Sequence, residues 1–133
     1  MSRFVPLFAL LACDEGAGDS GPARFYVEYV DPADGTVESV SVTNVYLQLS
    51  QVPDITRCTT DTIRVDAARD DGTVAFPVPS ELSVEGAAFV KLRPLDPDLR
   101  GWTYAVSVQG GDQGCVDEFG TPIEPFLSTF EVP

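Results

Sequence analysis

The sequence contains no histidine, the side chain that most often moves protons in enzymes. Its absence excludes Ser-His-Asp and Cys-His catalysis and most zinc sites. Serine and acidic residues are present, but no motif sets a nucleophile beside a base. We therefore expect no enzymatic activity and no cofactor.

Positive charge is also scarce, because 8 lysine and arginine residues stand against 21 aspartate and glutamate residues. The formal net charge of −13 repels the phosphates of nucleic acids and anionic lipid headgroups. We expect no nucleic-acid partner. Two interpretations of the acidity remain open, namely the solubility of an exported domain and the binding of a cation.

Long apolar runs are missing apart from one near the start of the chain. Phe4 to Ala12 forms nine consecutive apolar residues, preceded by the positive charge of Arg3. The run is too short to span a bilayer as a helix and suits the apolar region of a secretory signal peptide. We expect residues 1–12 to be a cleaved signal peptide.

The apolar run ends in Leu10-Leu11-Ala12-Cys13, which resembles the bacterial lipobox. The resemblance implies cleavage before Cys13 and attachment of a diacylglycerol to its thiol. The protein would then be extracytoplasmic and lipid-anchored, at the outer membrane or cell surface. Residues 13–23 are rich in Gly, Ala and acidic residues, a composition typical of a flexible tether. The alternative is an ordinary signal peptide followed by a chance cysteine.

Cysteine is rare, with three residues in the chain. If Cys13 carries lipid, Cys58 and Cys115 remain as an even pair in an oxidising compartment, and we expect a disulfide between them. The bridge would close a loop of 57 residues, worth about 4 kcal/mol in the chain-entropy model. Two free buried thiols are the alternative.

No segment has a convincing helical period, whereas seven segments alternate apolar and polar residues between turn signals. This pattern predicts an all-β domain over residues 24–133, an antiparallel sandwich of about seven strands, with a closed barrel as the alternative. Pro77 marks one strand as an edge strand. The predicted strands are residues 24–30, 43–49, 61–66, 73–78, 87–92, 102–108 and 126–132.

Alternation also predicts which side chains enter the core. Tyr29, Val74 and Phe76 belong to the predicted inward faces of their strands. Tyr104 suits a tyrosine corner, whose hydroxyl bonds to backbone upstream. Trp102 is expected to fill the core, or otherwise to be exposed for binding.

Several motifs occur in an order that resembles bacterial Ig-like domains of the S-layer (SbsA) type. They are Pro32-Ala33-Asp34-Gly35, the strand from Asn44 to Ser50, the strand from Leu99 to Val108, and Asp117-Glu118-Phe119-Gly120. The resemblance implies an immunoglobulin-like β-sandwich that serves as a structural or cohesive module of a surface protein. The paired cysteines look like a staple of one subfamily.

We therefore expect a non-catalytic, lipid-anchored envelope protein, with an unidentified envelope protein or polysaccharide as its partner. The alternative is a binding protein for a soluble ligand or cation that uses the loop of residues 109–125. Asp112, Asp117 and Glu118 in that loop are weak candidates for calcium, since they supply oxygen ligands but lack the EF-hand pattern.

Overall fold

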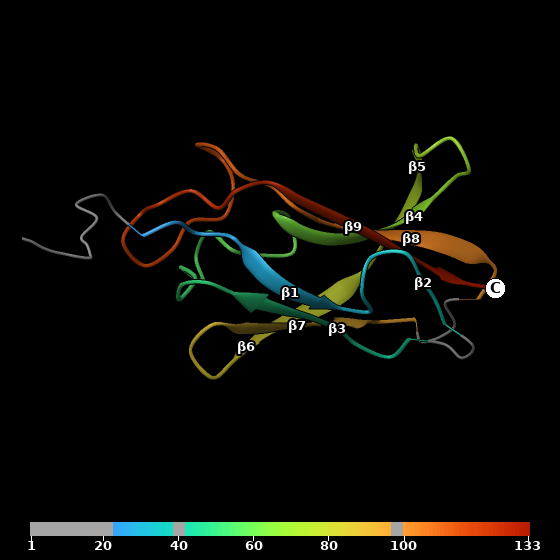
Figure 1. Ribbon diagram of the computed structural model, residues 1–133, viewed down its shortest axis with the longest axis horizontal. Helices are drawn as coiled ribbons and strands as arrows, with labels where there is room; N and C mark the ends of the chain where they lie inside the picture. Colours follow the sequence, from blue (N-terminus) through green and yellow to red (C-terminus); the bar gives the residue numbers. More distant parts are fainter. Residues whose placement is uncertain (1–22, 39–41, 97–99) are drawn as a thin grey trace, which may run out of the picture.

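The computed structural model describes residues 23–38, 42–96 and 100–133, which form β-strands and no helix (Figure 1). Within this part of the chain, no helix is therefore long and apolar enough to cross a bilayer. The predicted signal peptide, Cys13, Leu99 and nearly all of the tether lie outside the described residues. The strands are β1 (Val27–Asp31), β2 (Thr36–Val37), β3 (Val45–Leu49), β4 (Ile63–Ala68), β5 (Val74–Val78), β6 (Ser80–Glu85), β7 (Phe89–Pro94), β8 (Trp102–Val108) and β9 (Phe126–Val132).

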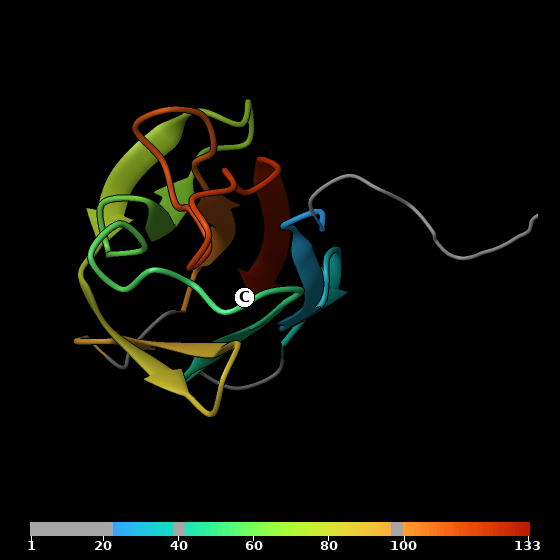
Figure 2. The ribbon, with the colours of Figure 1, turned by 90° about the vertical axis from the view of Figure 1, so that its left-hand side faces the viewer.

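The strands form two sheets that pack as layers, so the predicted β-sandwich is confirmed rather than a closed barrel. One sheet has the order β1-β3-β7-β6 and the other β2-β9-β8-β4-β5. Neighbours are antiparallel, apart from the short parallel pair of β2 and β9. Figure 2 shows β3, β6 and β7 in the lower layer and β4, β5 and β8 in the upper one.

The core lies between the sheets because alternate residues of the central strands point inward. In β3 and β8, the inward side chains are almost wholly buried, and the residues between them are partly exposed. The same rule holds for β7 and β9. The largest buried side chains include Phe25, Leu47, Leu49, Ile63, Leu92, Tyr104, Ile123 and Phe130.

Two strands were missed by the sequence pattern. β2 has only two residues, too few to show any alternation. β6 does alternate, with Leu82 and Val84 on one face. However, it follows Pro77 and Pro79 closely, and its other residues are serine and glutamate, so the segment resembles a turn in the sequence.

The prediction that Tyr29 points into the core is wrong, since its side chain is 56% exposed. A β-bulge causes the difference, because Val27 pairs with Leu49 whereas Tyr29 already pairs with Gln48. The extra residue reverses the alternation and directs Val30 toward the core instead.

Val74 and Phe76 were also predicted to be buried, and they are exposed by 50% and 39%. They lie on β5, which ends the five-stranded sheet as Pro77 predicted. Figure 1 shows β5 rising away from the four-stranded sheet, so its far end has little opposite it to pack against. An edge position therefore explains both the proline and the exposure.

Candidate functional site

One end of the sandwich, here called the loop end, consists of residues 52–58 and 109–125. A disulfide joins Cys58 to Cys115 with their Cα atoms 4.4 Å apart, which confirms the predicted pairing. Both cysteines are buried. The bridge ties the segment before β4 to the segment between β8 and β9.

Hydrogen bonds fasten the same two segments along their length. The amide of Asp54 donates to the carbonyl of Val116 at 2.9 Å, and the amide of Glu118 donates to the carbonyl of Val52 at 2.9 Å. Arg57 donates to the carbonyl oxygens of Asp112 at 2.5 Å and Gly114 at 3.1 Å. The long loop is therefore tied to its neighbour at several points rather than at the disulfide alone.

Asp117 organises the tip of this loop. Its carboxylate is buried and accepts hydrogen bonds from the amides of Phe119 at 2.9 Å and Thr121 at 2.8 Å. These bonds close the turn of residues 117–121. The turn leaves the side chain of Phe119 78% exposed.

The structure does not bring the calcium candidates Asp112, Asp117 and Glu118 together as a site. Across the residues it describes, no group of three or more Asp, Glu, His or Cys side chains is arranged to hold a metal. Asp117 directs an oxygen at turn amides, while Asp112 and Glu118 are exposed. Asp117 therefore shapes a turn in this loop.

Ile55 and Phe119 are functional candidates that the sequence pattern did not single out. They are exposed by 68% and 78%, and each lies on one of the two hydrogen-bonded segments of the loop end. Neither belongs to an alternating strand, so no periodic signal reveals its direction. Phe119 does follow Asp117 and precede Gly120, which places an aromatic residue at the tip of a turn.

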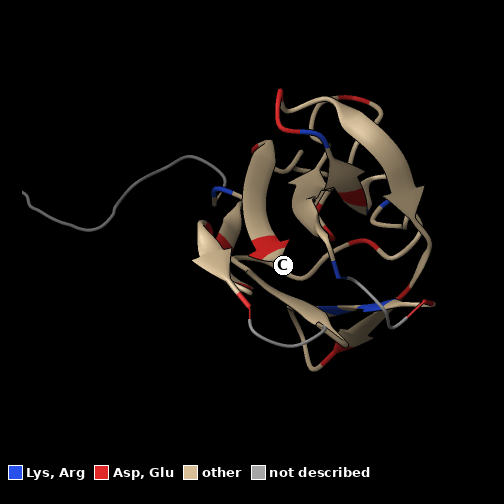
Figure 3. Ribbon diagram, turned by 90° about the vertical axis from the view of Figure 1, so that its right-hand side faces the viewer, with Lys and Arg blue, Asp and Glu red and all other residues tan. Residues whose placement is uncertain are grey.

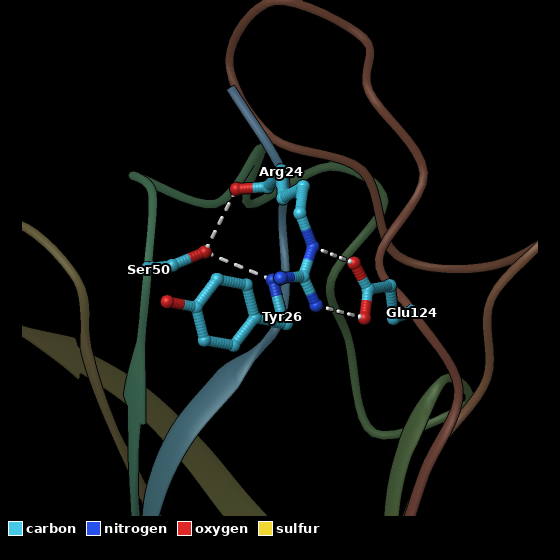
Figure 4. Close-up of polar contacts among 4 residues, drawn as sticks. All are labelled: Arg24, Tyr26, Ser50 and Glu124. Atoms are coloured by element: carbon cyan, nitrogen blue, oxygen red, sulfur yellow. Dashed lines mark hydrogen bonds and ion pairs between the residues drawn. The ribbon is translucent and has the colours of Figure 1, made fainter. Parts of the chain in front are cut away.

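The chain enters the domain at this same end, where Arg24 binds residue Glu124 (Figure 4). The guanidinium donates to both carboxylate oxygens of Glu124, at 2.7 and 2.8 Å, and lies 4.8 Å from the centre of the Tyr26 ring. The hydrogen bonds from Arg24 lower the pKa of Glu124, and the same contact raises the pKa of Arg24. The hydroxyl of Ser50 accepts a hydrogen bond from the Tyr26 amide at 2.9 Å, which also holds the first described residues against the domain.

At the opposite end, called the hairpin end, lie residues 68–74, Gly101, Trp102 and residues 131–133. The prediction that Trp102 fills the core is wrong, because it is 40% exposed. As the first residue of β8, it lies at the border of the sheet and packs edge-on against Phe76, with ring centres 5.0 Å apart.

Tyr104, two residues further along β8, is buried as expected and stacks on Phe130 with ring centres 5.5 Å apart. Burial keeps its ring away from any ligand at the surface. The hydrogen bond of a tyrosine corner stays a prediction.

Acidic residues are spread over both layers and the loops of the domain (Figure 3). Basic residues are few, and Lys91 and Arg93 both lie on β7. These two pair with Glu85 and Glu81 of the neighbouring β6. Neighbouring glutamates therefore balance the charge of both basic residues of this strand.

Solved structures share this fold. The S-layer protein rSbsC(31-844) aligns with a TM-score of 0.58 and 17% identity over 82% of this chain, which spans 14% of that protein. The N-terminal part of the S-layer protein SbsC aligns with a TM-score of 0.57 and 18% identity, over 83% of this chain and 24% of that chain. CopC from Methylosinus trichosporium OB3b aligns with a TM-score of 0.57 and 11% identity, over 82% of this chain and 93% of that chain. At such identities the likeness shows the fold alone.

No family model matches the chain, and no curated protein sequence matches it. The structural neighbours agree with the predicted S-layer-type Ig-like fold, and with nothing finer.

Proposed function

We propose that this chain is a non-catalytic lipoprotein domain of the bacterial cell envelope, anchored by a diacylglycerol on Cys13. The observation that carries the proposal is the entry of the chain at a firmly attached point, Arg24, directly after a lipobox-like motif and a short acidic segment. The fold shared with S-layer domains supports an extracytoplasmic structural or recognition role.

The anchor would limit how far one end of the domain can move from the membrane. Residues 13–23 reach at most about 40 Å when fully extended. Because the chain enters at the loop end, the anchor would keep that end within about this distance of the bilayer. Exposed Ile55 and Phe119 would then be available to an envelope partner close to the membrane.

Mass spectrometry of the intact protein from a membrane fraction tests the anchor. The wild type should begin at Cys13 and carry the mass of a diacylglycerol, and a Cys13→Ala variant should lose both the lipid and the membrane association. Stable anchoring is expected because two acyl chains bind a bilayer far more strongly than one. An unmodified wild-type species that begins after another residue would contradict the proposal.

The loop end favours recognition of a macromolecule over a free cation, since its carboxylates do not converge while two large apolar side chains are exposed. We expect calcium and EDTA to leave the melting temperature unchanged. A stabilisation that grows with calcium concentration would instead support a cation-binding function.

A further inference from the structure

The two sheets have four edges, and in the described residues three of them are protected against the addition of another strand. β1 carries a bulge, β5 contains Pro77, and β2 is only two residues long. The fourth edge is β6. It has six residues and no proline, and it pairs with β7 in an unbroken register from Ser80 opposite Pro94 to Glu85 opposite Phe89.

The backbone groups that β6 presents to its free side follow from the register. Leu95 donates its amide to the carbonyl of Pro79, so this opposite pair is hydrogen-bonded. Hydrogen-bonded and non-bonded pairs alternate in antiparallel sheets. Leu82 and Val84 therefore direct their amides and carbonyls away from β7. Among the described residues, no other strand pairs with this side of β6.

An apolar groove lies beside this edge. It has a volume of about 550 Å³ and is lined by Leu82 and Val84 of β6 and by Ile55 and Thr59 of the facing loop, among others. A second groove of about 310 Å³ continues along the same side, because both grooves share Thr60. An added strand would place every second side chain in this space.

Charge determines what kind of strand fits. Glu81 and Glu85 lie on the outer face of β6, where they pair with exposed Arg93 and partly buried Lys91. Asp61, which lines the second groove, forms no ion pair within the described residues. A second copy would bring like charges together, since the chain has a net charge of −13, whereas basic side chains would be attracted.

We propose that the free edge of β6 binds an extended segment of a partner protein by strand addition. The segment carries apolar residues at alternate positions and lysine or arginine between them. Backbone hydrogen bonds to Leu82 and Val84 supply affinity, and the groove and the glutamates supply specificity. This site lies outside the residues 109–125 and does not depend on the lipid anchor.

Binding of a labelled peptide, acetyl-Lys-Val-Lys-Val-Lys-Val-Lys-amide, to the mature protein in detergent micelles tests the proposal. Fluorescence anisotropy should detect binding, and hydrogen exchange should show protection of the Leu82 and Val84 amides. A peptide with glutamate in place of lysine should bind at least about tenfold more weakly, because like charges face each other across the strands. Absence of protection at β6 would overturn the proposal even if the basic peptide bound elsewhere.

Val84→Pro removes one outward amide while the ladder to β7 keeps its own bonds, so binding should fall about tenfold. The control Val84→Thr keeps the amide and should bind within about threefold of the wild type. If circular dichroism shows that the proline variant is unfolded, Glu81→Gln combined with Glu85→Gln gives a second test and should weaken binding of the basic peptide. Equal binding by folded variants, or dimerisation through β6 in sedimentation velocity, would refute this partner class. Loss of lipid from Cys13 would refute only the anchoring proposal.

Discussion

The loop end and the hairpin end hold their loops in place by different means. The loop end contains the longest irregular segment of the domain, residues 109–125, yet a disulfide, Arg57 and Asp117 hold it in place. The hairpin end has a short turn at residues 69–73, which is closed by backbone hydrogen bonds within the turn itself. The long segment is therefore held by cross-links to a neighbouring segment, whereas the short turn is held by local bonds.

Removing the strongest cross-link should have the largest effect. Replacing Cys58 and Cys115 together by serine is expected to lower the free energy of unfolding by about 4 kcal/mol, because the unfolded chain regains the freedom of a 57-residue loop. Chemical denaturation of the two proteins measures the difference. A loss below about 1 kcal/mol would show that the hydrogen bonds alone hold the loop end.

A methyl group at Gly114 should have the next largest effect. The Cβ of alanine would overlap the carbonyl oxygens of Gln109 and Gly110, which are backbone atoms and cannot rotate away. We expect Gly114→Ala to cost about 1–3 kcal/mol, as overpacking of a filled site does. Gln113→Ala, at the exposed neighbouring position, is the control and should change stability by less than about 0.5 kcal/mol. Equal stability of the two variants would show that this part of the loop moves aside.

The sandwich and the disulfide could be predicted from sequence because each leaves a strong physical signal. Alternation of apolar residues in 45–49, 102–108 and 126–132 reflects burial of one face of each strand, and the structure confirms all three strands. The two cysteines could be paired by their even number in an oxidising compartment once Cys13 was assigned to lipid. That pairing is confirmed, whereas lipid on Cys13 stays a prediction.

Side chains were wrongly predicted to be buried where apolar and polar residues alternate in the sequence but the strand face is not covered in the fold. Tyr29 lies beyond a bulge, which inserts one residue and leaves no mark on composition. Phe76 and Trp102 lie at the borders of the five-stranded sheet, and the borders depend on contacts distant in sequence. Gly114 provides a close approach of two backbone segments, a role that a pattern of residue types does not reveal.

Truncation of Trp102 should reveal how little the hairpin end relies on its largest side chain. A fully buried aromatic residue costs about 3–5 kcal/mol when replaced by alanine, and we expect this for Phe130→Ala. Trp102→Ala should cost only about 1 kcal/mol, because the side chain is 40% exposed and makes one edge-on aromatic contact. Thermal or chemical denaturation of both variants gives the comparison. Similar losses would mean that Trp102 belongs to the core after all.

The two ends should differ least in their response to acid. Both contain an aspartate that accepts two hydrogen bonds from the threonine two residues later. Asp54 at the loop end accepts hydrogen bonds from the amide and hydroxyl of Thr56 at 2.9 and 2.6 Å. Asp71 at the hairpin end accepts the same pair from Thr73 at 3.0 and 2.7 Å. The threonine hydroxyls, and then the amides, lower the pKa of each aspartate in the folded state.

A lowered pKa means that each turn stabilises the fold above the pKa that the aspartate has in the unfolded chain. The stabilisation is lost as the pH falls through the lower pKa of the folded state. Asp54→Asn and Asp71→Asn should therefore each flatten the acid side of the stability profile by a similar, small amount. Carboxyl chemical shifts followed by NMR titration should place the pKa of both aspartates below that of an aspartate in an unstructured peptide, about 3.9. A depressed pKa at only one of the two sites would show that the turn at the other site opens in solution, and would tell which end is the less ordered.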